Sequence, residues 1–172
     1  EPEHSARTSL QSQIVNRCHS VPSPGAGLCS EWVSHVFYPV LGSYPNGDAC
    51  DMFWNWCYSR DISQLKVGMI VAVPTHTHTS AGARWGHIAI YIGNGMVMDN
   101  IGYIRTTSLA WWLNYYHTTA IPQWGWVLNT LWNDADSDQH AESTLACVSN
   151  HKRFLTVYHV WNAIIHSKGI EG

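Results

Sequence analysis

Three side chains in this sequence have the types and spacing of a nucleophilic catalytic site, namely Cys29, His87 and Asp99. An imidazole can take the proton of a thiol, and a carboxylate can hold that imidazole in the required tautomer and orientation. Without a nucleophile, His87 and Asp99 would be better explained as a solvated histidine and an aspartate at the end of a turn. The position of Cys29 therefore decides the interpretation.

Residues 87–98 have the composition of a β-hairpin. The segment His87–Ile92 is rich in β-branched and aromatic residues, which suit a pleated, half-buried surface. Gly93-Asn94-Gly95 follows, and these residue types accept the positive φ of a tight turn. A turn centred on Asn94 sets residues whose numbers sum to about 188 opposite one another. His87 then falls near Asn100, with Asp99 adjacent, so one end of the hairpin is expected to carry an imidazole and a carboxylate.

Cys29 stands where a loop is expected to enter a helix. Two prolines and two glycines between Val21 and Gly27 exclude a regular element there, and an apolar helical face follows at Trp32, Val33, Val36 and Phe37. Unpaired backbone N–H groups and the helix dipole favour an anion at this position, so the reactive thiolate is stabilised. The same N–H groups can hold a developing oxyanion. A small buried core residue is the commonest alternative, but the loop-to-helix position favours reactivity.

The other segments predict further helices and strands. Helices are expected over residues 8–18, 48–58 and 108–115, and strands within residues 65–73 and 124–127. Thr106 or Thr107 is the expected cap of the helix at 108–115. Residues 39–47 are expected to form a loop, as are residues 75–83. His76 and His78 in the second loop are better explained as solvated side chains than as metal ligands.

Length and charge restrict the classes of protein. The 172 residues fit one catalytic domain at 1–132, followed by an acidic linker and a tail of unassigned role at 133–172. Asp134–Asp138 is the linker, and residues 154–165 could form an amphipathic helix. The net charge of −3 offers no basic surface for nucleic acid. No apolar run approaches the ~20 residues that span a bilayer.

The cysteines are five in number, so at least one stays outside any intramolecular set of disulfides: Cys18, Cys29, Cys50, Cys57 and Cys147. Along an unbroken helix, Cys50 and Cys57 would have Cα atoms ~10 Å apart, whereas a disulfide needs them within ~7 Å. Either the helix bends or ends between them, or they do not pair. The sequence has no Cys-x-x-Cys pair, and neither a metal nor an organic cofactor is expected.

Three blocks resemble the NlpC/P60 and CHAP papain-like peptidases. Gly27-Leu28-Cys29-Ser30-Glu31-Trp32-Val33 looks like their nucleophile helix, Leu65–Val71 resembles their "L-x-P-G-D-L-V" strand entry, and Gly86–Gly95 resembles their "GHVGIYLGNG" strand pair. The resemblance covers roughly residues 8–127. It implies an α+β fold in which an antiparallel sheet of five or six strands packs against the helix that carries the nucleophilic cysteine.

The resemblance also implies roles for four residues. Cys29 is expected to be the nucleophile, His87 the base and Asp99 the third polar residue, with Asn100 as the less favoured alternative for that third role. The NlpC/P60 pattern has Asp immediately before the cysteine, where this sequence has Leu28. The Gly-x-Cys-x-x-Trp-Val form is more similar to CHAP.

The expected function is a cysteine peptidase or amidase that hydrolyses amide bonds, with peptide or peptidoglycan as its substrate. Two rivals share the fold. One is an acyltransferase, or a hydrolase of a lipid or toxin amide; the other is a non-catalytic cell-wall-binding module. A third rival, a disulfide-stapled structural domain, requires Cys29 to be oxidised. No secretory signal pattern is seen in the chain, and the location implied by the resemblance is outside the cell or in its envelope.

Overall fold

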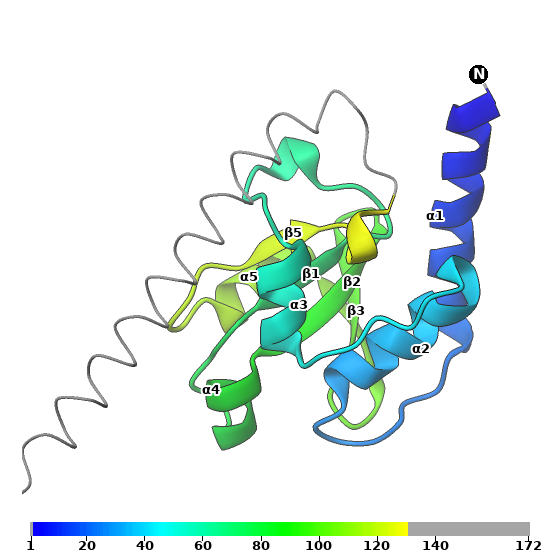
Figure 1. The fold of residues 1–172 in the computed structure, drawn as a ribbon. Helices are drawn as coiled ribbons and strands as arrows, with labels where there is room; N and C mark the ends of the chain where they lie inside the picture. Colours follow the sequence, from blue (N-terminus) through cyan, green and yellow to red (C-terminus); the bar gives the residue numbers. More distant parts are fainter. Residues whose placement is uncertain (1, 131–172) are drawn as a thin grey trace, which may run out of the picture. The chain divides into compact units, whose positions relative to one another are not determined.

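The computed structural model describes residues 2–130; the tail at 133–172, with Asp134–Asp138, the helix expected at 154–165 and Cys147, lies outside the described residues. The elements follow one another as α1 (Pro2–Ser20), α2 (Cys29–Leu41), α3 (Ala49–Trp56), η1 (Ile62–Gln64), β1 (Ile70–Val73), α4 (Ser80–Trp85), β2 (His87–Gly93), β3 (Met96–Asn100), β4 (Ile104–Ser108), α5 (Leu109–Tyr116), β5 (Gln123–Gly125) and η2 (Val127–Asn129). Figure 1 shows their arrangement.

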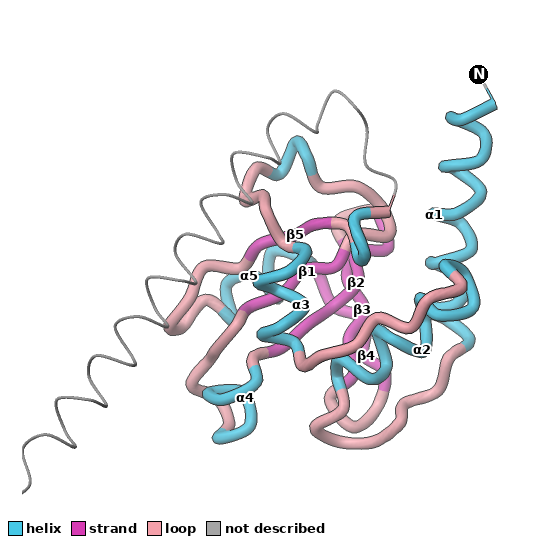
Figure 2. The backbone as a smooth tube through the Cα atoms, in the orientation of Figure 1, coloured by secondary structure: helices cyan, strands magenta, loops and turns pink. Residues whose placement is uncertain are grey.

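The strands form a five-stranded antiparallel sheet in the order β4-β3-β2-β1-β5 (Figure 2). Its central hairpin has the predicted register, because Ala89 pairs with Asp99 and Tyr91 pairs with Val97. The turn also has the predicted chemistry, with positive φ at Gly93, Asn94 and Gly95. The expected α+β fold with an antiparallel sheet is therefore confirmed.

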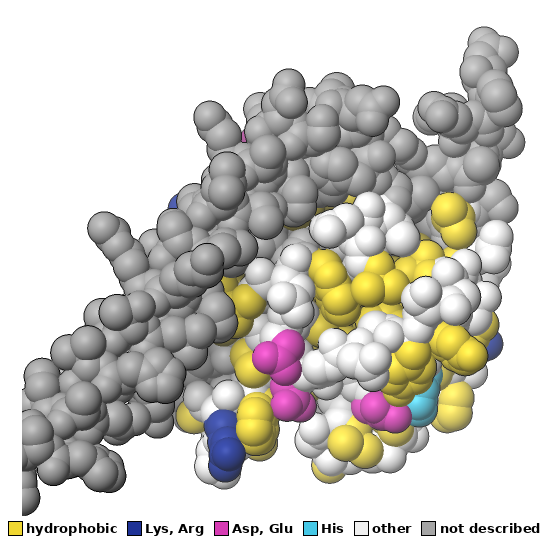
Figure 3. Space-filling view, viewed as in Figure 1, with side chains coloured by type: hydrophobic (Ala, Val, Ile, Leu, Met, Phe, Trp, Pro, Cys, Tyr) yellow, Lys and Arg dark blue, Asp and Glu magenta, His cyan; other side chains and the backbone are white. Residues whose placement is uncertain are grey.

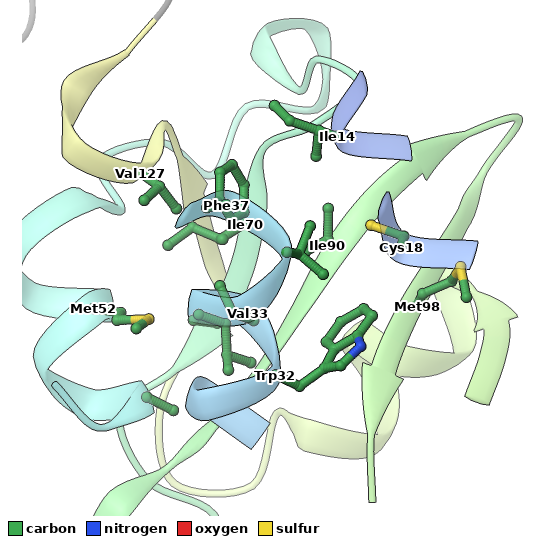
Figure 4. Packing of buried hydrophobic residues seen from close by; sticks show 14 of the residues in the cluster. Ile14, Cys18, Trp32, Val33, Phe37, Met52, Ile70, Ile90, Met98 and Val127 are labelled. Atoms are coloured by element: carbon green, nitrogen blue, oxygen red, sulfur yellow. The ribbon is translucent and has the colours of Figure 1, made fainter. Parts of the chain in front are cut away.

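Hydrophobic side chains cover the sheet on both faces. On one face, α1, α2 and α3 pack on alternate residues of the central strands; Figure 4 shows side chains of α2, such as Val33 and Phe37, near Ile70 and Ile90. On the other face, α5 covers the intervening residues of the same strands, among them Val71 and Val97. β1 is buried at all four positions because it lies between these two layers. The helix that begins at Cys29 is thus fixed against the sheet along most of its length.

Charged side chains are sparse on the face drawn in Figure 3, where apolar and uncharged polar side chains make up most of the described surface. Among the described helices, none combines the length and the apolar composition needed to cross a bilayer.

The prediction of a loop from residue 39 was wrong, because α2 continues through Pro39 to Leu41 and ends at Gly42, which has a left-handed φ of 70°. A proline inside a helix removes one backbone N–H, here the donor that would reach the carbonyl of His35. The guanidinium of Arg17 donates to that carbonyl at 3.1 Å. A side chain of α1 therefore satisfies the group that Pro39 leaves open.

Two further elements differ from the predictions. Residues 104–108 form β4 and Ser108 caps α5, since its hydroxyl accepts the N–H of Trp111 at 3.2 Å, so Thr106 and Thr107 are strand residues rather than caps. The loop expected at 75–83 contains the start of α4, which Thr79 caps by accepting from Gly82 N at 2.8 Å. Both elements are too short for their periodicity to be visible in the sequence.

The contact between Arg17 and His35 predicts a coupling with Pro39. We expect Arg17→Met to lower the free energy of unfolding by about 1–2 kcal/mol, because a partly buried carbonyl loses its donor. In a Pro39→Ala background the restored N–H can serve the same carbonyl, so the loss should be smaller. A double-mutant cycle by urea unfolding measures this, with Arg60→Met at an exposed position as the control. Strictly additive effects would contradict the explanation.

Candidate active site

Cys29 is the first residue of α2, directly after the loop at residues 21–28. Gly25 and Gly27 in this loop have φ of 128° and 78°, so the chain can turn sharply into the helix. Leu28 is the N-cap residue and supplies no side-chain hydrogen bond. The first-turn N–H groups are therefore not capped by a side chain of that residue. Cys29 is half-buried and carries a free thiol.

His87 and Asp99 lie on the same face of the sheet. Asp99 pairs with Ala89 on β2 and with Arg105 on β4. Since Ala89 is two residues from His87, all these side chains point the same way. His87 Nε2 donates to Asp99 Oδ2 at 2.8 Å. A carboxylate only accepts, so Nε2 carries a hydrogen and Nδ1 is left for other partners.

Asp99 is completely buried, and three side chains donate to its carboxylate. Besides the bond from His87, Arg105 donates to both oxygens, through Nε to Oδ1 at 3.0 Å and through a terminal nitrogen to Oδ2 at 2.6 Å. Trp112 Nε1 on α5 donates to Oδ2 at 3.0 Å. Burial alone would raise the pKa of Asp99, but the bonds from His87 and Arg105 hold it below its usual range. Asp99 is thus kept ionised.

Aromatic rings of α5 cover one face of His87. The ring of Tyr116 stacks on the imidazole with a centroid distance of 4.5 Å, and that of Trp112 lies further away at 5.9 Å. Arg105 donates to the hydroxyl of Tyr116 at 3.2 Å. Arg105 therefore contacts both the carboxylate at the edge of His87 and the ring on its face.

The side chain of Cys29 lies close enough to His87 to raise the pKa of the imidazole. Because Nε2 faces Asp99, Nδ1 is the nitrogen available to the thiol. Burial alone would lower the pKa of His87, but the bonds and charges of Asp99 and Cys29 raise it to about 9. An imidazole in this setting can receive and hold the thiol proton.

Asn100 does not take part in this chain of contacts. Adjacent strand residues point to opposite faces, so its amide faces the loop before α2. It donates to the carbonyls of Gly25 at 2.8 Å and Leu28 at 3.1 Å, and it accepts from Ser23 Oγ at 2.6 Å. The sequence allowed Asn100 as an alternative partner of His87. In the structure, Asn100 instead holds the loop at residues 21–28 that precedes Cys29.

A cleft of about 390 Å³ opens at Cys29 and His87. One side is formed by Gly27, Ser30 and Asp48, and the other by α4 and the loop before it. His76, expected to be solvated, is buried in that second side, whereas His78 is exposed. Among residues 2–130 no three His, Cys, Asp or Glu side chains gather in a way that could hold a metal ion.

Comparisons with known proteins relate this geometry to one fold. No protein-family model matches the sequence, and neither does any curated protein. The solved structure of NlpC1 from Trichomonas vaginalis is similar over 68% of this chain, with a TM-score of 0.50 at 14% identity. The chain has the NlpC/P60 fold.

The present chain spans 44% of the length of the NlpC1 chain, so its likeness to that protein covers less than half of it. The NlpC/P60 domain of the peptidoglycan hydrolase SagA is similar over 59% of this chain and 91% of its own, with a TM-score of 0.39 at 20% identity.

Four residues of this candidate site were not assigned to it from the sequence, namely Arg105, Trp112, Tyr116 and His76. Arg105 could have been found only with β4 in place, because its pairing with Asp99 depends on that strand. Trp112 and Tyr116 are one helical turn apart and share a face of α5, a spacing that also fits an ordinary core helix. His76 has no local signal in the sequence.

The ion pair of Arg105 and Asp99 predicts two effects of Arg105→Met. The free energy of unfolding should fall by about 3 kcal/mol, because a buried carboxylate loses its cation. The pKa of His87 should rise further above 9, since the positive charge that opposes its protonation is gone. Urea unfolding and NMR titration of the His87 ring measure both effects. Arg105→Lys should keep the pKa of His87 near that of the parent, Arg60→Met should change neither quantity, and a lowered His87 pKa in Arg105→Met would refute this account.

The two buried histidines predict that the free energy of unfolding is greatest near pH 6.5, the ordinary histidine pKa. His87 has a raised pKa of about 9, so the folded chain binds more protons above pH 6.5 and stability is lost as the pH rises toward 9. His76 has a lowered pKa of about 4, so the unfolded chain binds more protons below pH 6.5 and stability is lost as the pH falls. Each limb is worth at most about 3 kcal/mol.

Urea unfolding between about pH 4.5 and 9.5 checks this pH dependence. His87→Gln should flatten the alkaline limb and His76→Gln the acid limb. His117→Gln, at an exposed position, should leave both limbs in place. An alkaline limb that survives in His87→Gln would assign the effect to another group.

Proposed function

We propose that this protein is a cysteine hydrolase that cleaves amide bonds in peptidoglycan stem peptides, with Cys29, His87 and Asp99 as its catalytic residues. The observation that supports this most is the hydrogen bond between Asp99 and His87, together with the nearby Cys29 side chain, which raises the pKa of His87. The thiol lies on the first turn of α2, beside an open cleft. A buried base between an ionised carboxylate and a thiol is the arrangement that nucleophilic catalysis requires.

The proposed reaction has two stages. His87 Nδ1 takes the proton of Cys29, and the sulfur attacks the amide carbonyl carbon. The N–H of Cys29 stabilises the negative oxygen of the tetrahedral intermediate. The C–N bond then breaks as His87 gives its proton to the leaving amine, which leaves a thioester on Cys29. A water molecule attacks the thioester while His87 accepts its proton, and the carboxylic acid departs as the thiol is restored.

Asp99 keeps its charge through both stages. Its hydrogen bond holds His87 with Nε2 protonated and stabilises the imidazolium that forms in each one. Arg105 and Trp112 fix the carboxylate in turn. Asp99 therefore orients the base without itself becoming protonated.

The substrate class rests on the resemblance of the blocks around Cys29, Val67 and His87 to peptidases that usually act on peptidoglycan. A location outside the cell or in its envelope follows from that substrate. Acyl transfer by the same residues differs only in the acceptor of the second stage, an amine or alcohol in place of water.

Substitution of the proposed catalytic residues tests this function. We expect the full chain to release peptide fragments from a muropeptide preparation, as measured by mass spectrometry, and Cys29→Ala and His87→Ala to abolish the release. Asp99→Ala should reduce the rate less than His87→Ala, because orientation is lost but not the base itself. Cys50→Ala, a thiol that does not line the cleft, is the matched control. Cleavage by Cys29→Ala would disprove the assignment, and products joined to an added amine would favour the transferase.

Thiol labelling separates an enzyme from a binding module. We expect iodoacetamide at neutral pH to label Cys29 faster than Cys50. The pKa of Cys50 is raised by burial and by the charges of Asp51 and Asp48. Labelling of Cys29 at the rate of a model thiol would favour the non-catalytic module.

A further inference from the structure

The cleft contains a second histidine that the proposed mechanism does not use. His76 lies between β1 and α4, is only 4% exposed, and lines the cleft together with Cys29 and His87. Its ring meets that of His87 edge to face at a centroid distance of 6.1 Å and that of Tyr116 at 5.0 Å. A buried polar side chain at this place is expected to have a hydrogen-bond partner.

The hydrogen bonds of His76 fix its tautomer. Its Nδ1 accepts the backbone N–H of His78 at 3.2 Å, and a backbone N–H can only donate. The neutral ring must therefore carry its hydrogen on Nε2. Within the part of the chain that the structure describes, this Nε2–H makes no hydrogen bond to a protein group, and Nε2 is not one of the buried atoms without a partner. Because His76 lines the cleft, the donor is available to a group that binds there.

The charge of His76 is also fixed. Burial, and then the positive charges of His87 and His78, lower its pKa to about 4. The neighbouring His87 has a pKa of about 9. At neutral pH the cleft thus holds one histidine that is protonated and one that stays neutral. Such a divergence between neighbouring titratable groups indicates different roles in one site.

Packing holds the ring of His76 in place. A Cβ at Gly82 would lie 2.0 Å from both Cε1 and Nε2 of His76, so α4 must have glycine where the ring rests. The backbone N–H of His76 donates to the carbonyl of Gly82 at 3.1 Å. The donor is therefore positioned before any substrate binds, which lowers the entropy cost of binding.

We propose that His76 Nε2–H forms a substrate-binding site in the cleft and donates to an amide carbonyl oxygen of the bound peptide. A neutral donor matches an uncharged oxygen, because a carboxylate here would lose its hydration without gaining a cationic partner. This binding site rests on the proposed function and adds to it, since it assigns peptide recognition to the side of the cleft formed by α4. His76 acts on binding and is not needed for proton transfer.

The test uses binding by the full chain with Cys29→Ala, so that no turnover interferes. The probe is a purified stem tetrapeptide, measured by calorimetry. We expect His76→Phe to weaken binding about fivefold to tenfold, the effect of one lost neutral hydrogen bond. His76→Gln, which returns an N–H near the Nε2 position, should recover most of the loss. His117→Phe, at an exposed position outside the cleft, should bind as the Cys29→Ala parent does.

Further measurements distinguish the loss of a hydrogen bond to the peptide from a folding defect. Gly82→Ala should displace the ring and weaken binding while His76 itself is unchanged, and melting temperatures identify any unfolded variant. ¹⁵N NMR of the His76 ring should show a neutral Nε2–H tautomer whose signal shifts when the tetrapeptide binds. Equal affinity of His76→Phe and the parent, no shift at Nε2, or no binding at all by Cys29→Ala would each overturn the inference. Binding that depends on His76 without hydrolysis by the unmodified chain would refute the proposed function alone.

Discussion

The structure of the site depends on one buried carboxylate. Asp99 is fully removed from solvent, and an isolated charge there would be very unfavourable. It is stabilised because donors reach it from three elements, with His87 on β2, Arg105 on β4 and Trp112 on α5. Each donor is in turn fixed by that contact. The strand order and the position of α5 are therefore coupled to the orientation of a single imidazole ring.

Because β3 is pleated, two neighbouring residues of this strand point to opposite faces of the sheet and hold different parts of the site. Asp99 points to the face covered by α5, where it holds His87. Asn100 points to the other face, where its amide holds the carbonyls of Gly25 and Leu28 just before the cysteine. Consecutive residues of β3 therefore hold the base in place and hold the loop that leads to the nucleophile. This arrangement rigidly joins the thiol at the start of α2 to the imidazole on β2, since β3 is paired with a strand on each side.

The two buried histidines of the cleft show how environment separates identical side chains. His87 lies beside an ionised carboxylate and a thiol, which raise its pKa to about 9. His76 lies among aromatic rings and near positive charge, and burial lowers its pKa to about 4. Neither difference follows from the neighbouring sequence. Both come from what the fold brings within a few ångströms of each ring.

The sequence by itself determined the local features. The hairpin register, the turn at Gly93–Gly95, the buried strand after Gly68 and the loop that leads into the helix at Cys29 all follow from residue types over a few positions. Tertiary structure alone decided the features that depend on distant partners. Arg105 meets Asp99 only once β4 pairs with β3, Arg17 of α1 satisfies the carbonyl that Pro39 leaves open in α2, and His76 is buried against Gly82 and the rings of His87 and Tyr116. Such contacts join segments far apart in the chain, where periodicity and propensity carry no information.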